Sequence, residues 1–258
     1  MRSRDYIAVD TETTGLNPKI DKIIEIGALK VRNDEIWEQF SMMVNPHREL
    51  SEQVRELTGI RQEEVDVALG IETVLPKFLE FAEDLPLLGH RISFDYQFLK
   101  QAAVNLGLSF ERDGIDTLKI SRQLMPPEER KTLSAACRYY GIEPEISHRA
   151  LADAQAAHLL YQETALLYDL AYPEIFIKKP LIYKVKKEQP ASKRQKQLLQ
   201  DLLKYHRIDV PVEIAYLSRN EISRLVDTII LQYGRMNTQI CRKQDDNKQD
   251  DRKQHDKK

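Results

Sequence analysis

Two acidic residues, Asp10 and Glu12, close an apolar stretch that begins at Ile7. Such a run is typical of a buried strand, and because strand side chains alternate, both carboxylates project from the same face. Neighbouring buried carboxylates repel each other and lose hydration, and a divalent cation is the commonest way to stabilise them. Taken alone, the same pattern more often marks an exposed strand end with two solvated acids.

Further acidic residues and a histidine follow at three positions, Asp95, His148 and Asp153. Residues five apart cannot share one face of a helix, since each residue turns by about 100°. We therefore expect His148 in the loop before a helix and Asp153 in the first turn of that helix, so that both point toward one centre. A histidine considered by itself would more often be a capping or otherwise hydrogen-bonded residue.

Three motifs now stand in a characteristic order: Asp-x-Glu-Thr-Thr-Gly at 10–15, Phe-Asp at 94–95 and His-x4-Asp at 148–153. In this respect the chain resembles the DEDDh family of 3'–5' exonucleases over residues 5 to about 170. This family includes the proofreading epsilon subunit of bacterial DNA polymerase III. The resemblance implies an RNase H-like fold and two Mg²⁺ or Mn²⁺ ions held by Asp10, Glu12, Asp95 and Asp153. It also implies that Asp10 bridges both ions.

The chemistry expected of such a site is phosphodiester hydrolysis. Two divalent ions neutralise the nonbridging oxygens, help to form hydroxide near neutral pH and stabilise the leaving oxygen. Carboxylates suit hard Mg²⁺ or Mn²⁺ better than softer metals. His148 is the expected general base, because an imidazole accepts a proton near neutral pH. The expected products are nucleoside 5'-monophosphates released one at a time from a 3' end.

The resemblance also assigns six side chains to the last nucleotide of the substrate: Thr13, Thr14, Leu16, Thr58, Ile60 and Phe94. The two threonines at 13 and 14 correspond to the part that receives the terminal 3' hydroxyl. Leu16 and Phe94 correspond to residues that pack on the nucleotide, and the loop with Thr58 and Ile60 borders the terminal base. Each could equally be a turn or core residue. Arg91 stands where relatives often have Asn, which leaves substrate handling open.

The pattern of apolar residues predicts an α/β fold of the RNase H-like type. Strands are expected over 7–12, 23–31 and 36–44, and the short turns between them favour an antiparallel three-strand meander. Two further short strands are expected over 85–90 and 115–118, and helices over 51–57, 71–82, 93–102, 132–140 and 150–170. Strands followed by alternating strand and helix indicate a mixed sheet flanked by helices.

Charge divides the chain unequally. Residues 1–170 contain 19 Lys+Arg and 29 Asp+Glu, a balance of −10, whereas residues 171–258 contain 20 and 12, a balance of +8. We expect an exonuclease domain over 1–172, a basic linker over 173–190, a small two-helix module over 191–235 and a charged disordered tail over 236–258. The basic rear part could add electrostatic attraction to nucleic acid.

Composition excludes several classes of protein. No apolar run approaches the roughly 18 residues that a membrane span requires, and the first residues show no apolar signal region, so we expect a cytoplasmic protein without membrane contact. Cys137 and Cys241 form neither a disulfide framework nor a zinc cluster.

The sequence thus predicts a metal-dependent 3'–5' exonuclease that acts on nucleic acid with a free 3' end, with single-stranded DNA favoured. No polymerase motifs are present, so proofreading or repair would require a DNA polymerase or repair partner. One alternative is a 3'–5' exoribonuclease in RNA processing, since no residue reads the 2'-hydroxyl in an obvious way. Another is a non-catalytic nucleic-acid-binding or assembly module, although none of the four acids is lost.

Overall fold

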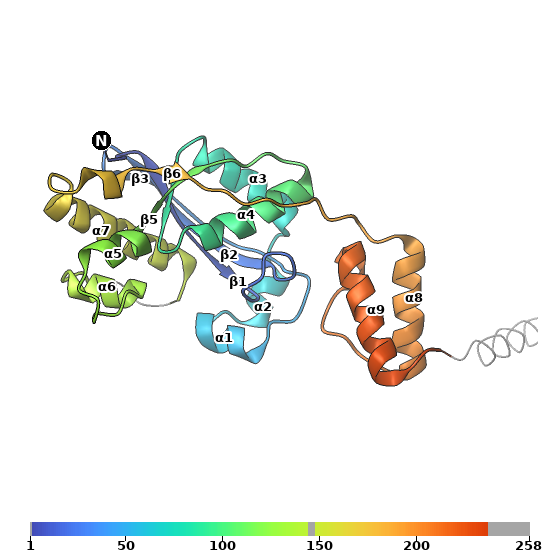
Figure 1. Cartoon of the computed structure of the whole chain (residues 1–258). Helices are drawn as coiled ribbons and strands as arrows, with labels where there is room; N and C mark the ends of the chain where they lie inside the picture. The colour runs from blue at the N-terminus through green and yellow to red at the C-terminus, as the bar shows by residue number, and fades with distance from the viewer. Residues whose placement is uncertain (1, 144–147, 237–258) are drawn as a thin grey trace, which may run out of the picture. The chain divides into compact units, whose positions relative to one another are not determined.

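The computed structural model describes residues 2–143 and 148–236. The chain divides into two compact units, residues 1–187 and 188–258, and each is described by itself (Figure 1). The charged tail expected over 236–258 lies outside the described residues except for Met236. Among the described helices, none combines the length and the apolar character needed to cross a membrane.

A six-stranded sheet in the order β3-β2-β1-β4-β5-β6 forms the centre of the first unit. Its strands are β1 (Tyr6–Thr13), β2 (Ile23–Arg32), β3 (Glu35–Met43), β4 (Leu87–Gly89), β5 (Asp113–Asp116) and β6 (Lys179–Pro180). The first three pair antiparallel, β4 and β5 continue the sheet parallel to β1, and β6 is antiparallel to β5. The predicted mixed sheet with its three-strand meander is confirmed, whereas β6 was not predicted.

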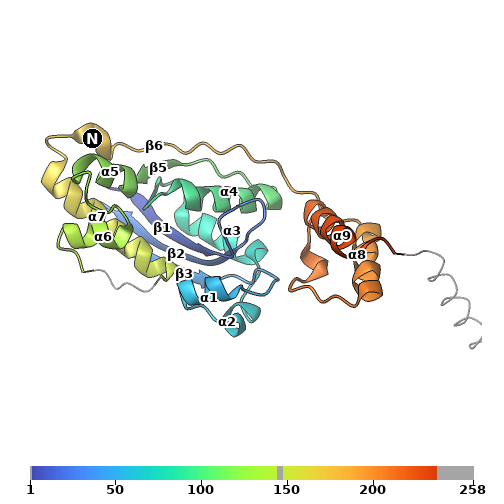
Figure 2. The same ribbon diagram turned by 60° about the horizontal axis from the view of Figure 1, so that its bottom comes forward.

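Helices cover both faces of this sheet (Figures 1 and 2). They are α1 (Glu52–Thr58), α2 (Gln62–Asp66), α3 (Ile71–Ala82), α4 (Ser93–Leu106), α5 (Thr117–Leu124), α6 (Leu133–Tyr139) and α7 (Ala150–Tyr168), followed by the 3₁₀ turn η1 (Pro173–Phe176). The sequence analysis missed the two short helices α2 and α5.

The alternation of side chains along β1 separates two cores. Ile7 and Val9 pack with α3 and α4 on one face, while Tyr6 and Ala8 pack with α7 on the other. A strand that is buried on both faces reads as a continuous apolar run, which is why β1 is recognisable in the sequence. The same alternation decides which helix each polar residue at the end of β1 meets.

The segment 173–187, which we expected to belong to a linker, packs on the first unit. Phe176 is fully buried in the core beside α7, and Leu181 and Tyr183 pack against the core beside α3 and α4. The lysines at 184 and 186 alternate with these apolar residues and remain exposed. The lysines and prolines indicated a solvated linker, but one apolar side of an extended segment is sufficient to hold it on the domain.

The second unit contains α8 (Lys193–His206), the turn η2 (Ile214–Tyr216) and α9 (Arg219–Tyr233). Each helix begins with a capping box, in which the cap serine and the residue three positions later exchange hydrogen bonds. The buried core of the unit consists of Leu199, Leu202, Leu203, Leu217, Ile222, Val226 and Ile229.

Candidate active site

Three acids meet at the carboxyl end of β1. Asp10 and Glu12 continue the series of residues that faces α7, and Asp153 lies in the first turn of that helix. One carboxylate oxygen of each residue lies within 4.8 Å of those of the other two. The strand and the helix therefore bring together three possible metal ligands that are far apart in the sequence.

Asp95 approaches from the opposite face of the sheet. It lies in the first turn of α4, is only 3% exposed, and its Oδ1 accepts hydrogen bonds from the backbone N–H of Thr11 at 3.0 Å and the Thr11 hydroxyl at 2.8 Å. Thr11 points to the α4 face because it alternates with Asp10 and Glu12. Asp95 is therefore not one of the three acids that lie within 4.8 Å of one another, although its charge reaches Asp10.

Burial raises the pKa values of all four acids, and repulsion by the other acids of the site adds to the shift at Asp10 and Glu12. Burial raises the pKa of Glu12 to about 8, and the charge of Asp153 adds to this effect. Burial raises the pKa of Asp95 to about 7, although the hydrogen bonds from Thr11 oppose the shift. The pKa of Asp10 is raised by burial and by the charges of Asp95 and Glu12. Carboxylates in such surroundings are stabilised in their charged form by a bound divalent cation.

His148 lies two residues before α7, with an exposed side chain and a positive φ of 45°. Burial raises the pKa of Asp153, and the charge of His148 opposes this shift. The histidine therefore lies in the segment that leads into the helix of Asp153, as the five-residue spacing predicts. Exposure leaves its imidazole accessible to solvent.

The residues expected to contact the substrate differ in exposure, since some reach the surface and others are buried. Leu16 is 82% exposed, and Phe94 is partly buried, with its ring 5.0 Å from that of Phe98. By contrast, Ile60 is fully buried beneath the surface of the α1–α2 region. The hydroxyl of Thr58 donates to the carbonyl of Val54 and accepts from the backbone N–H of Ile60. Thr58 and Ile60 thus shape their loop from within.

The two threonines at the end of β1 hold the turn that follows them. The Thr13 hydroxyl donates to the carbonyl of Gly15 at 2.6 Å, and the Thr14 hydroxyl accepts from the backbone N–H of Lys22 at 3.0 Å. These hydrogen bonds keep the loop with Leu16 beside the acids. The backbone N–H of Thr14 also donates to the Lys22 carbonyl at 2.8 Å, which adds a further contact to this turn.

Arg91 also lies next to the site and has a strained backbone. Its φ is 75°, its N–H donates to the Asp116 carboxylate at 3.1 Å, and its guanidinium lies 5.8 Å from the centroid of the Phe94 ring. The side chain is exposed. A cation thus covers part of the aromatic side chain that was predicted to pack on the nucleotide.

The sequence analysis missed Glu25, which lies on β2 directly opposite Glu12. Its side chain is 2% exposed and forms an ion pair with Arg149, at the N-terminus of α7. The sequence contains one signal for this residue, because Glu25 is the single acid within the otherwise apolar run from Ile23 to Leu29. A charged residue in such a strand requires a partner.

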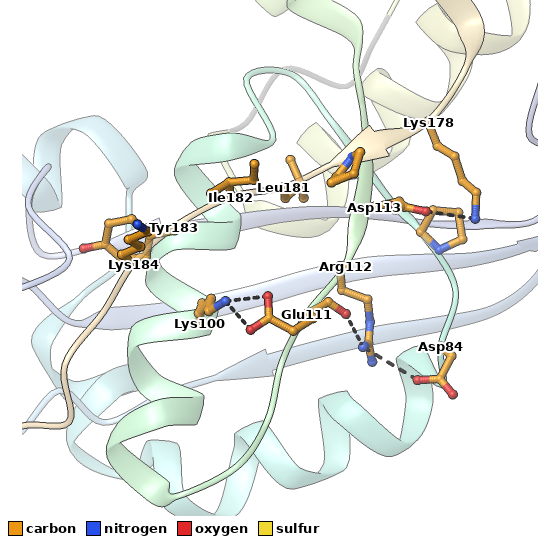
Figure 3. Close-up of a pocket in the computed structure, with 12 residues that line it drawn as sticks. Asp84, Lys100, Glu111, Arg112, Asp113, Lys178, Leu181, Ile182, Tyr183 and Lys184 are labelled. Atoms are coloured by element: carbon orange, nitrogen blue, oxygen red, sulfur yellow. Dashed lines mark hydrogen bonds and ion pairs between the residues drawn. The ribbon is translucent and has the colours of Figure 1, made fainter.

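A separate hollow of about 510 Å³ lies against β5 and the segment after β6 (Figure 3). None of the four acids lines it. Six of its charged side chains form the pairs Lys100–Glu111, Arg112–Asp84 and Lys178–Asp113. Lys184 lines the hollow as well, and the hollow is distinct from the acidic site.

Comparison with known proteins agrees with this arrangement. Residues 7–161 match the RNase T exonuclease family. Over 151 residues the chain is 40% identical to a DNA polymerase III PolC-type protein of Thermotoga maritima. This match covers 58% of the chain but only 11% of the relative, so the chain spans about a tenth of the length of that polymerase.

Solved structures share the fold at low sequence identity. Exonuclease X in complex with 5' overhanging duplex DNA superposes with a TM-score of 0.52 at 24% identity, over 66% of this chain and 96% of that one. Exonuclease I of E. coli in complex with a dT13 oligonucleotide gives a TM-score of 0.56 at 18% identity, over 67% and 43% of the two chains.

Proposed function

Because the chain belongs to the RNase T exonuclease family, we propose that it is a metal-dependent 3'–5' exonuclease that releases nucleoside 5'-monophosphates from DNA. The convergence of Asp10, Glu12 and Asp153 within 4.8 Å supports this function above all other observations. A purely structural role would not explain why three carboxylates lie within 4.8 Å of one another.

The donor set fits a hard divalent cation. All three converging ligands are carboxylates, which Mg²⁺ and Mn²⁺ prefer over softer metals. We propose that Asp10, Glu12, Asp95 and Asp153 together hold two such ions, with Asp10 shared. When bound, the ions supply Lewis acidity for the phosphodiester and lower the pKa of a coordinated water.

The other residues of the site position the substrate and move a proton. His148 accepts the proton of the attacking water at its imidazole, a role that its exposed position before α7 supports. Leu16 and Phe94 pack on the terminal nucleotide, while Thr13 and Thr14 receive the 3' hydroxyl through their backbone and side-chain groups. Thr58 and Ile60 hold the loop that borders the terminal base.

The choice of DNA rests on the relatives, which are named DNA polymerase III PolC-type proteins. We propose single-stranded DNA as the preferred form, with the reaction serving proofreading or repair in association with a DNA polymerase or repair protein. A pull-down from the source cell with the Asp10→Asn variant tests this association, because a trapped substrate keeps the partner on the same DNA. Recovery of no replication or repair protein would argue against it.

The decisive experiment uses matched DNA and RNA oligonucleotides with a 5' label, incubated with Mg²⁺ or Mn²⁺. We expect a ladder that shortens from the 3' end, mononucleotide products and faster turnover of DNA. EDTA and the Asp10→Asn variant should abolish the ladder. Faster turnover of RNA would identify RNA rather than DNA as the preferred substrate. Equal binding of both oligonucleotides without any product would favour a non-catalytic nucleic-acid-binding module.

A further inference from the structure

Glu25 and Arg149 form a paired contact between β2 and the start of α7. Arg149 Nε donates to Glu25 Oε2 at 3.0 Å, and Arg149 Nη2 donates to Oε1 at 2.8 Å. This is the two-point geometry in which arginine binds a carboxylate most strongly. Glu25 also accepts the backbone N–H of Ala150 at 3.2 Å. One carboxylate thus binds the side chain just before the helix and a free N–H of its first turn.

The contact replaces the cap that α7 lacks. The residue at the N-cap position is Arg149, whose side chain makes no capping hydrogen bond, so the N–H groups of the first turn need another acceptor. An acidic side chain at a helix N-terminus also interacts favourably with the helix dipole. Glu25, on a neighbouring strand, supplies both the hydrogen-bond acceptor and the negative charge. It thereby fixes the end of the helix relative to the sheet.

Gly27 allows the helix to approach at the same place. A Cβ atom on Gly27 would lie 2.0 Å from the backbone N of Leu151 and 2.2 Å from the carbonyl carbon of Ala150. Gly27 lies opposite Asp10, and Glu25 lies opposite Glu12. The side of β2 that carries Glu25 and Gly27 therefore faces the start of α7 directly beside the acids of β1. Backbone contact and ion pair together leave the helix little freedom to shift.

The start of α7 is also where two residues of the site are attached. His148 immediately precedes Arg149, and Asp153 lies in the first helical turn after it. A small rotation of this turn would move the imidazole and the carboxylate together, away from Asp10 and Glu12. Groups that orient metal ligands from outside the ligand set commonly matter for activity nearly as much as the ligands.

We propose that Glu25 and Arg149 are positioning residues of the exonuclease, which hold His148 and Asp153 at the metal site by fixing the first turn of α7 on β2. This inference rests on the proposed function. Neither residue contacts the substrate or a metal in this role. Arg149 also compensates the buried charge of Glu25, which would otherwise add to the repulsion among the acids.

The test uses the full chain with Arg149→Lys, Glu25→Gln and the double variant. Lysine keeps the charge of Arg149, whose side chain is 43% exposed, but cannot bind the carboxylate at two points. We expect kcat on a short DNA oligonucleotide to fall about 10- to 100-fold in each variant, with KM within about twofold. Mn²⁺ affinity, measured by electron paramagnetic resonance without substrate, should weaken about 10-fold.

A matched control comes from an acid after α3 that pairs with the same strand. Glu83→Gln removes an acid that pairs with Lys30 and Arg32 of β2, away from α7, and should leave kcat and Mn²⁺ affinity unchanged. The inference is overturned if folded Arg149→Lys or Glu25→Gln protein keeps both values within twofold of the wild type, even if its melting temperature falls. Should Glu25→Gln fail to fold, Arg149→Lys decides.

The Mn²⁺ measurement separates this inference from the proposed function. Wild-type protein that binds Mn²⁺ but hydrolyses no oligonucleotide would refute the exonuclease. Weaker Mn²⁺ binding by Arg149→Lys would in that case still support the positioning of Asp153 by the pair. Unchanged Mn²⁺ binding by Arg149→Lys would refute the positioning role of Glu25 and Arg149 as well.

Discussion

The two units of the chain obtain their structure in different ways. In the first, β1 pairs with β2 and β4, and α4 and α7 pack on opposite faces, so that Asp10, Asp95 and Asp153 depend on contacts between distant segments. In the second, two neighbouring helices each begin with a capping box and share one small core. The comparison shows that local signals are sufficient for the second unit, whereas the site of the first depends on tertiary structure.

The two units also differ in chemistry. Among the described residues, the single group of acids close enough to hold a metal lies in the first unit, which also contains the family match. The second unit lies outside that match and follows a lysine-rich segment. We expect the first unit to perform catalysis and the second to modulate binding, and the following experiments test that division.

The largest effect is expected at the acids of the first unit. Asp10→Asn or Asp153→Asn should lower kcat by about a thousandfold or more, because each removes a charged ligand from the proposed metal site. Single-turnover hydrolysis of a labelled DNA strand measures the loss. Asp201→Asn on α8 is the matched control and should retain full activity. A tenth of the wild-type rate in Asp10→Asn would remove the basis of the proposed mechanism.

His148→Gln should lower kcat by about 10²- to 10⁴-fold, the range typical of a general base. Unlike the acid variants, it should bind Mn²⁺ with nearly wild-type affinity, because the proposed ligand set does not include His148. Rate and metal titration together distinguish these effects. His206→Gln in the second unit serves as the control, and a joint loss of Mn²⁺ binding in His148→Gln would contradict the assigned role.

Leu202→Ala should destabilise the second unit by about 2–5 kcal/mol, since it empties a fully buried position in a small core. Differential scanning calorimetry should show a separate transition at lower temperature, with the transition of the first unit unchanged. Leu198→Ala on the same helix changes a side chain that is 42% exposed and should have little effect. A single transition shifted by Leu202→Ala would show that the units unfold together.

Removal of residues 188–258 should leave kcat on a short oligonucleotide intact, while KM on a long strand rises about three- to tenfold. The reason is the loss of basic residues that release counterions from DNA, so the dependence of KM on salt should also become shallower. Steady-state assays at several salt concentrations measure both. An unchanged salt dependence would exclude an electrostatic role for the second unit.

The smallest effect concerns a buried histidine of the first unit. His158 Nδ1 lies 2.9 Å from the Tyr6 hydroxyl, which also accepts a hydrogen bond from Gln162. Burial lowers the pKa of His158, although Asp34 opposes this. As pH falls below about 6.5, the unfolded chain therefore binds the proton first, and stability is lost.

The advantage of wild type over His158→Gln in free energy of unfolding should accordingly shrink by at most about 1.4 kcal/mol per pH unit below that value. Urea titrations at three pH values measure the difference. An advantage that does not change with pH would show that His158 titrates alike in both states.

Much of the fold could be predicted because its signals are local. The helix over Ile71–Ala82 has the predicted bounds, and the capping box of Ser218 and Glu221 marks the start of α9. The segment around Tyr183 could not be predicted, because its lysines and its apolar residues support opposite interpretations until a core is available to bury one side.

The sequence by itself determined the residue types of the site, since the order and spacing of Asp10, Glu12, Asp95, His148 and Asp153 are properties of the chain. Tertiary structure decided how they meet. The pleat of β1 turns Asp10 toward α7 but Thr11 toward Asp95, and Glu25 becomes the cap of α7 only when β2 and the helix pack together. Such contacts join residues more than eighty positions apart, so no local pattern in the sequence records them.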